Sequence, residues 1–342
     1  MLHYFRDAVL IGFVLCLVLT IATAAQDESV IRRAAFDIGS SSIKCTVADV
    51  DTATGDIVKV VKEYSRKVDF AEDMARSYDG NFSHAVMDQG MAALKELKLK
   101  ALDLNAKSFS AIGSTTIRDA RNGRAYFATI ENEVGMSCRI ISKQQAAMLC
   151  YHAVRQEKDI QAQDLLVWDI GGSSQQMIAR ALDGSLAFYI DKMASVSFKN
   201  AVIRTIQDKD IITVSSPNPI SEPQANRALQ YVETHARMNV TPLLANRIKG
   251  GSMQVVGIGG VHNYAIPELL GESKPAYTHA EVKATLGKWI NRPDADFKSE
   301  YASSRLTNLI LVLGYMNALG IDSISPLKVN QAEGLLVSPE YW

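Results

Sequence analysis

The sequence predicts an α/β protein in which one arrangement of strands and turns occurs twice. A strand ending in Asp-Ile-Gly is followed by a polar turn and two further strands, first from Arg33 and again from Leu165. Segments with apolar residues at helical spacing lie between short apolar runs, a pattern typical of α/β chains. The 342 residues suffice for two domains of ordinary size.

Each predicted element follows from its local pattern. The strands are short apolar runs bounded by turn residues, such as Thr54-Gly55-Asp56. The helices have apolar residues three or four positions apart. In the first half we expect strands at 33–37, 43–50, 57–64, 109–112 and 139–141, and helices at 85–102, 124–134 and 144–156. In the second half we expect strands at 165–169, 176–181, 186–190 and 254–257, and helices at 222–235 and 305–319.

The composition excludes several classes of protein. Hydrophobic residues make up 47%, which excludes a disordered chain. The formal net charge of -1 argues against nucleic acid as a partner, because such proteins normally carry a basic excess. A site for a small anion needs only local donors and stays compatible with this charge. The four cysteines are too few for a disulfide scaffold and form no CxxC pair, so we assign them no metal.

The N-terminal segment 1–25 predicts a signal peptide or a membrane anchor. Residues 8–25 carry no charge, Arg6 precedes them, and Ala22-Thr23-Ala24 is a suitable cleavage site. We therefore expect an exported protein, periplasmic or anchored at the inner membrane. Arg32 and Arg33 favour the alternative of an uncleaved helix with the body on the cytoplasmic side. A buried core helix is the third interpretation. After this segment, we expect a first domain at 31–158 and a second at 159–342. The protein could also form a homodimer.

Three glycine-bearing turns carry the candidate chemistry. A Gly/Ser turn between strands exposes successive N–H groups and hydroxyls, which suit phosphate oxygens, and glycine allows close approach. One such turn is usually only a hairpin, but two copies headed by aspartate and a third turn favour a ligand site. The candidate phosphate-binding residues are Gly39, Ser40, Ser41, Ser42, Gly171, Gly172, Ser173, Ser174, Gly259 and Gly260. Asp37 and Asp169 are candidate ligands of Mg²⁺ against phosphate oxygens.

The motifs resemble one known family. FDIGSSSIKCTVADV, GSTTIRDARN, VWDIGGSSQQMIA, MASVSF, VVGIGGV and VNQAEGLL are similar in kind and order to those of the exopolyphosphatase/guanosine pentaphosphate phosphatase (Ppx/GppA) family. The resemblance runs from about Arg33 to the C-terminus. It implies two ribonuclease H-like domains of the actin-like superfold, each with a mixed five-stranded sheet, and an active site in the cleft between them.

The resemblance also implies an activity and further site residues. The family hydrolyses a terminal phosphoanhydride of polyphosphate or guanosine pentaphosphate with Mg²⁺. Gly113, Thr115 and Arg118 fall on a family segment whose arginine faces the substrate phosphates. The planar guanidinium of Arg118 suits phosphate oxygens on its own account. Without the resemblance, it could equally be a surface arginine at the start of a helix.

Three departures from the family pattern concern the chemistry. The resemblance implies catalytic glutamates at positions 144, 145 and 176, where this chain has Gln144, Gln145 and Gln176. An amide can orient a water molecule but cannot accept its proton at neutral pH. Fewer carboxylates also weaken the capture of Mg²⁺. Ala332 stands where the family usually has arginine.

These residues leave two functions open. The first is a phosphoanhydride phosphohydrolase with attenuated activity, since a glutamine orients the attacking water in GTPases. The second is a non-catalytic protein of the envelope that binds polyphosphate or a nucleotide. A sugar-kinase-like ATPase would share both phosphate turns but is disfavoured by Arg118 and the MASVSF segment.

Overall fold

In the computed structural model, each half of the chain forms one mixed sheet. The structure describes residues 29–156, 163–181, 183–250, 253–271 and 274–342. The predicted leader at 1–25 therefore lies outside the described residues. No helix in the described ranges is long and apolar enough to cross a membrane.

The first sheet has five strands. Its strands are β1 (Val30–Ile38), β2 (Ser42–Asp51), β3 (Ile57–Lys67), β4 (Ser108–Gly113) and β5 (Ser137–Ile140). Their order is β3-β2-β1-β4-β5. The strands β1, β2 and β3 pair antiparallel, whereas β4 and β5 run parallel to β1.

The second sheet repeats this plan and adds one short strand. Its strands are β6 (Leu165–Ile170), β7 (Gln175–Arg180), β8 (Leu186–Asp191), β9 (Gln254–Ile258), β10 (Tyr277–Thr278) and β11 (Ser323–Pro326). The order is β10-β11-β9-β6-β7-β8, with β9 and β11 parallel in the places of β4 and β5. The predicted duplication is confirmed. The expectation of five strands is wrong for this sheet, because β10 extends its edge by pairing with β11.

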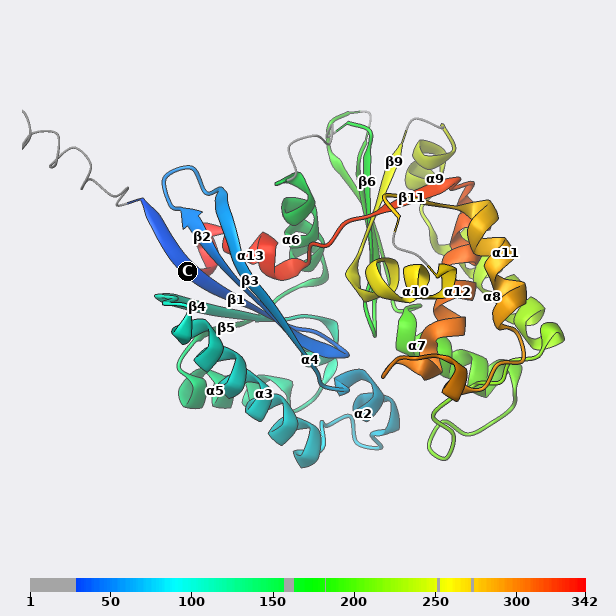
Figure 1. Cartoon of the computed structure of the whole chain (residues 1–342), viewed down its shortest axis with the longest axis horizontal. Coiled ribbons are helices and arrows are strands. Elements are labelled where there is room, and N and C mark those ends of the chain that lie inside the picture. Colours follow the sequence, from blue (N-terminus) through cyan, green and yellow to red (C-terminus); the bar gives the residue numbers. More distant parts are fainter. Residues whose placement is uncertain (1–28, 157–162, 182, 251–252, 272–273) are drawn as a thin grey trace, which may run out of the picture.

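Helices cover both sheets (Figure 1). The first half contains α2 (Phe70–Arg76), α3 (His84–Asp103), α4 (Thr115–Asp119), α5 (Gly123–Val134) and α6 (Lys143–Arg155). The second half contains α7 (Ser195–Ala201), α8 (Glu222–Asn239), α9 (Pro242–Lys249), α10 (Ile266–Leu270), α11 (His279–Trp289), α12 (Ala302–Leu319) and α13 (Gln331–Leu336). Most helices that the pattern did not predict are short, so they contain too few turns for a periodic apolar stripe.

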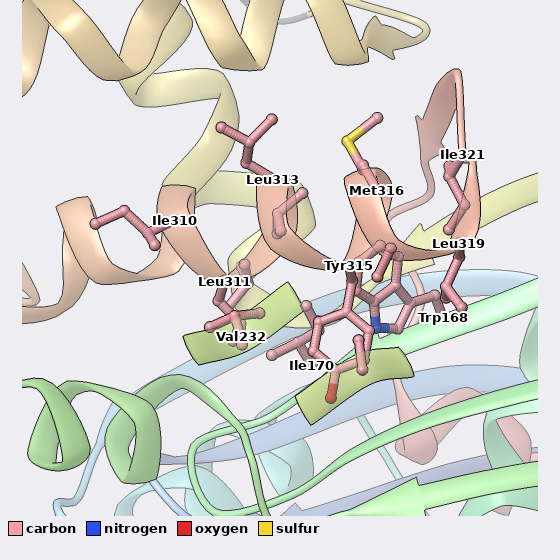
Figure 2. Close-up of a cluster of buried hydrophobic side chains, with 14 of the residues drawn as sticks. Trp168, Ile170, Val232, Ile310, Leu311, Leu313, Tyr315, Met316, Leu319 and Ile321 are labelled. Atoms are coloured by element: carbon pink, nitrogen blue, oxygen red, sulfur yellow. The ribbon is translucent and has the colours of Figure 1, made fainter. Parts of the chain in front are cut away.

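The most deeply buried helix is α12, which crosses the outer face of the second sheet. Nine of the ten positions from Leu309 to Ala318 are buried and hydrophobic or small, and Asn317 is the exception. Figure 2 shows Leu311 and Tyr315 of this helix close to Trp168 and Ile170 of β6. Tyr315 also shares a hydrogen bond of 2.6 Å between its hydroxyl and that of Tyr189 on β8. This packing fixes the strand whose end carries Asp169.

The helix α6 lies between the two sheets. Ala146 and Leu149 pack with residues of the first sheet, whereas Ala147 and Cys150 pack with strands of the second. The helix begins at Ser142, whose side chain accepts a hydrogen bond from Gln145 N. One helix thus supports both strand ends that carry the candidate site.

The C-terminal residues return to the first sheet. Ala332, Leu335 and Tyr341 join a buried cluster with residues of β1, β2 and β4. Figure 1 shows α13 beside these strands, after an extended crossing from β11. The last residues thus pack with the first half, because their apolar side chains are buried there. The domain range 159–342 stays a prediction.

We predict that Gly334→Ala strongly destabilises the protein. A methyl group at position 334 would lie 2.0 Å from the carbonyl oxygen of Leu149 in α6, and the backbone there cannot move alone. We expect a loss of about 1–3 kcal/mol or more in the free energy of unfolding by urea titration.

Gly287→Ala is the matched control. It also lies within a helix, α11, and a methyl group there would have no heavy atom within 4 Å. We expect this change to be neutral or to stabilise by about 0.5–1 kcal/mol. Equal losses for both variants would contradict the assignment of a close contact between α13 and α6.

Candidate phosphate and metal site

Two similar turns form the centre of the candidate site. Each follows the central strand of its sheet, β1 or β6, and each closes with one hydrogen bond. Gly39 N donates to Ser42 O at 3.0 Å, and Gly171 N donates to Ser174 O at 2.9 Å. Such turns leave the intervening N–H groups and hydroxyls facing outward, where an anion can be bound.

The two turns are in direct contact through their hydroxyls. Ser40 Oγ lies 2.6 Å from Ser173 Oγ, which in turn lies 2.7 Å from Thr116 Oγ1. Thr115 Oγ1 lies 2.9 Å from Ser174 Oγ. The hydroxyls predicted to bind phosphate are therefore brought together, and in this structure they bind one another.

Glycine is required where the third turn meets the second. Gly259 has a φ of +84°, and a methyl group there would lie 2.6 Å from Asp169 Oδ1. The turn at Gly259 and Gly260 therefore approaches the carboxylate of Asp169 more closely than any larger residue would allow.

All three turns border one cavity of ≈ 1150 Å³. Its wall includes Asp37, Asp169, Gly39–Ser42 and Gly259–Gly260. Carboxyl ends of parallel strands are where open α/β sheets bind ligands, and both sheets direct these ends to the cavity. Ser173 and Thr115 do not border the cavity; their hydroxyls contact the residues of the turns that do.

Burial perturbs both aspartates. Asp37 is only 6% exposed, and burial raises its pKa to about 6; the charge of Lys44 opposes this rise and that of Asp169 adds to it. Burial also raises the pKa of Asp169, again against the charge of Lys44. Asp37 Oδ1 is buried without a hydrogen-bond partner in the described part of the chain. An unpaired buried carboxylate oxygen is suited to a cation or a donor from a ligand.

Gln176 bonds directly to one of these carboxylates. Its Nε2 donates to Asp169 Oδ2 at 3.1 Å and to Cys150 Sγ at 3.0 Å. The thiol of Cys150 donates to the same Asp169 oxygen at 3.4 Å. Burial raises the pKa of Cys150 well above its usual range, so the thiol is protonated and acts as a donor.

The other two glutamines lie away from the cavity wall. Gln144 and Gln145 are exposed on the first turn of α6. Gln145 Oε1 accepts a hydrogen bond from Ser142 N at 2.8 Å, which completes the cap of that helix. In this structure, the side chain of Gln145 stabilises a helix start.

Arg118 also has local partners. Its Nη1 donates to Ile141 O at 2.7 Å, and its Nη2 donates to Thr115 Oγ1 at 3.1 Å. The guanidinium therefore connects Ile141, shortly before α6, to the Thr115 hydroxyl that contacts Ser174. Arg118 does not border the cavity, and it reaches the second phosphate turn only through Thr115.

The comparisons with known proteins agree with this architecture. Residues 46–200 match the Ppx/GppA phosphatase family. Over this segment, the chain is similar to that family. The fold is similar to the Ppx/GppA family member of Aquifex aeolicus, with a TM-score of 0.68, 18% identity, and coverage of 91% of this chain and 98% of that one. The predicted family is thereby confirmed.

Two further solved structures support the same fold. An exopolyphosphatase from Cytophaga hutchinsonii has a TM-score of 0.71 and 14% identity, with coverage of 90% of this chain and 97% of that one. An exopolyphosphatase-like protein has a TM-score of 0.73 and 16% identity, with coverage of 91% and 98%. At these identities the likeness concerns the fold, which is the two-part actin-like fold of the Ppx/GppA family.

The family implies a bound Mg²⁺. The residues present fit this ion only if a phosphate ligand supplies part of its coordination shell. In the described residues, no group of three or more His, Cys, Asp or Glu side chains could hold a metal ion. Asp37 and Asp169 supply two carboxylates, and Asp37 Oδ1 has no other partner. Mg²⁺ commonly binds to one or two carboxylates and completes its shell with phosphate oxygens and water.

Sequence reasoning missed a cation and a carboxylate on the cavity wall, Lys44 and Glu63. It also missed Glu333, a buried carboxyl group close to Glu63. Lys44 lies opposite Asp37 in the pairing of β1 with β2, and Glu63 lies opposite Thr46 in the pairing of β2 with β3. Glu333 of α13 accepts a hydrogen bond of 3.1 Å from Thr46 Oγ1. Lys44 is seven residues after Asp37, so the hairpin register was the available signal. The position of Glu333 depends on the return of the C-terminus and had no local signal.

Glu333 is the most strongly perturbed carboxyl group of the cavity region. Only 4% of it is exposed, and burial together with the nearby carboxyl group of Glu63 raises its pKa to about 8. At neutral pH it is therefore mainly protonated. In the folded state this group binds a proton more tightly than in the unfolded state, where its pKa is near 4.5.

We predict that Glu333 makes the protein less stable as the pH rises. Its contribution is fully present below pH 4.5 and is lost as the pH rises through about 8, because the folded state must then release the proton. The Glu333→Gln variant should lose less stability than the parent between pH 5 and pH 9, by at least about 1 kcal/mol, since one pKa unit corresponds to about 1.36 kcal/mol.

Urea titrations at several pH values measure this difference. Glu340→Gln is the control, because Glu340 is exposed near the same end of the chain. A Glu333→Gln variant with the same pH dependence as the parent and the control would contradict the assignment of a raised pKa.

Proposed function

We propose that the chain is a phosphoanhydride phosphohydrolase with low turnover, acting on polyphosphate or guanosine pentaphosphate. The observation that carries this proposal is the contact between two Asp-headed Gly/Ser turns at one cavity. A phosphate chain entering there meets hydroxyls and N–H groups from both halves of the protein. Similarity to a phosphatase family supports the same reaction class.

The chain's own groups would bind and orient the terminal phosphate. Ser40, Ser173 and Thr116 would exchange their mutual hydrogen bonds for bonds to phosphate oxygens. Phosphoryl transfer has a loose transition state, so positioning and charge neutralisation supply most of the catalysis. Mg²⁺, held by Asp37 and Asp169, would supply neutralising charge when bound.

The low turnover follows from the amides. A water molecule that attacks the terminal phosphorus must lose a proton, and Gln176 cannot accept it. A positioned general base typically contributes about 10²–10⁴-fold to the rate. Without one at the family positions, we expect hydrolysis that is slow but dependent on the phosphate turns.

A non-catalytic binding protein of the envelope is the second candidate function. The observation that favours it is the bond between Gln145 and the start of α6, which commits this side chain to the helix cap. The apolar segment 8–25 supports export of either protein, and an exported chain would meet polyphosphate more readily than a cytoplasmic nucleotide. Turnover of tripolyphosphate, measured beside its binding, separates the two functions.

We predict that the two aspartates are needed for Mg²⁺-dependent binding. In the presence of Mg²⁺, Asp37→Asn and Asp169→Asn should each weaken tripolyphosphate binding at least about tenfold, which is about 1.4 kcal/mol. Each change removes one of two carboxylates that can hold the ion. Isothermal titration calorimetry at fixed Mg²⁺ measures the effect.

The control for both variants is Asp322→Asn. Asp322 is exposed before β11, and its contact with His279 uses a backbone oxygen that the change retains. The same loss in the control would indicate an effect on folding and would count against the site.

We also predict that Gln176→Glu increases the affinity for Mg²⁺. The new carboxylate would lie against Asp169 in place of the amide that now donates to it. Two adjacent carboxylates repel each other when no metal is bound, and both can bind the same metal ion when it is present. We expect the melting temperature in EDTA to fall by a few degrees, and Mg²⁺ to restore it. Hydrolysis should rise about tenfold, a small share of what a positioned base contributes.

Gln89→Glu serves as the matched control, because Gln89 is exposed on α3. Thermal unfolding in EDTA and in Mg²⁺ tests both variants side by side. If Gln176→Glu responded to Mg²⁺ no more than Gln89→Glu, the placement of position 176 beside the metal would be incorrect.

A further inference from the structure

A buried ion pair joins two short helices across the two halves of the protein. Lys199 of α7 donates from its Nζ to Glu72 Oε1 of α2. The side chain of Lys199 is only 1% exposed, and its ammonium group also donates to Ser215 O at 2.9 Å. The helices α2 and α7 lie side by side where the two halves meet (Figure 1). Because solvent and salt screen so enclosed a pair very little, it can hold the halves together at this point.

Both helices are bonded at their starts to the phosphate turns. In the first half, Ala71 N in the first turn of α2 donates to Ser40 O at 2.8 Å. In the second half, Val196 N in the first turn of α7 donates to Gly172 O at 2.8 Å. Each helix is therefore fixed to its phosphate turn through the backbone. The ion pair between the helices thus also connects the two turns.

The turns that are connected in this way leave no room for a phosphate group between them. The hydroxyls of Ser40 and Ser173 bond each other at 2.6 Å. A methyl group at Gly172 would lie 2.3 Å from Ser41 Oγ and 2.9 Å from Ser40 Cβ, so the turns are already in van der Waals contact there. Atoms packed this closely cannot admit a phosphate group without moving. A phosphate that binds to hydroxyls of both turns must therefore move the turns apart.

We propose that the Lys199–Glu72 pair is a latch, which holds the two phosphate turns together and thereby opposes the binding of phosphate between them. The ligand in this inference rests on the proposed function, whereas the latch itself concerns only the chain. A ligand that binds only the form with separated turns has an apparent affinity reduced by the fraction of molecules in that form. Lys199 and Glu72 are positioning residues, because they act on the ligand through the turns.

The test breaks the pair at Glu72. In Glu72→Gln, the buried ammonium group of Lys199 loses its counter-ion, and it regains water only when the helices separate. We expect small-angle X-ray scattering to give a larger radius of gyration for this variant than for the parent. We also expect its affinity for tripolyphosphate at fixed Mg²⁺, measured by isothermal titration calorimetry, to rise at least about fivefold, because more molecules have separated turns.

Lys192→Gln is the matched control. Lys192 Nζ contacts Asp119 Oδ2 at 2.6 Å across the same two halves, but the side chain of Lys192 is 66% exposed. Exposed ion pairs contribute little, so the scattering profile should match that of the parent, and the affinity should stay within about twofold. Lys199→Gln breaks the buried pair from its other side, in case Glu72→Gln does not fold, and it should also raise the affinity.

The outcomes separate the latch from the proposed function. If the parent binds tripolyphosphate and Glu72→Gln binds it equally or more weakly, the inference is overturned and the proposed function survives. A folding defect lowers the affinity, so it cannot produce the rise that we expect. Binding by Glu72→Gln alone would support both. If neither protein binds tripolyphosphate, the proposed function fails, and the radius of gyration decides the latch: a larger radius for Glu72→Gln establishes it, and an unchanged radius overturns it.

Discussion

The close contact between α13 and α6 is the constraint on which the site depends. Gly334 lies against the backbone of Leu149, so the last helix can rest on a helix that already packs between the two sheets. Because α6 touches the strands ending in both aspartates, this stack supports both turns. The same contact brings Glu333 to Thr46 and Gln331 to Asp169. A segment distant in sequence thereby completes the cavity floor.

Charge balance is the second constraint. Two carboxylates are buried near each other, and desolvation raises the pKa of both. Neighbouring groups oppose this rise: the ammonium of Lys44 for both aspartates, and the donors of Gln176 and Cys150 for Asp169. Glu333 has the carboxyl group of Glu63 close by, and its pKa is about 8. The difference between these carboxyl groups is therefore a difference in neighbours, since all of them are largely enclosed.

The sequence predicted the features that depend on residues adjacent in the chain. The repeated Asp-Ile-Gly turns indicated both sheets and the candidate phosphate-binding residues, because glycine and hydroxyl side chains act through the adjacent backbone. The strand β11 escaped prediction, since Ser-Ile-Ser-Pro is too short to alternate. Arg118 and Gln145 were assigned to the site by resemblance, yet their nearest partners are Ile141 and Ser142. Lys44 depends on hairpin register and Glu333 on the path of the C-terminus, which motifs do not contain.

The departures from the family pattern are consistent with one another. An amide at position 176 can donate to Asp169, whereas a glutamate there would need a metal or a proton between the two oxygens. The positive charge of Lys44 also opposes the rise in the pKa of Asp169. Replacing glutamate by glutamine therefore removes a base and, at the same time, removes a repulsion that only a bound cation could relieve. With glutamine at position 176, Asp169 therefore has two neighbouring donors, the Gln176 amide and the Cys150 thiol, in place of a second carboxylate.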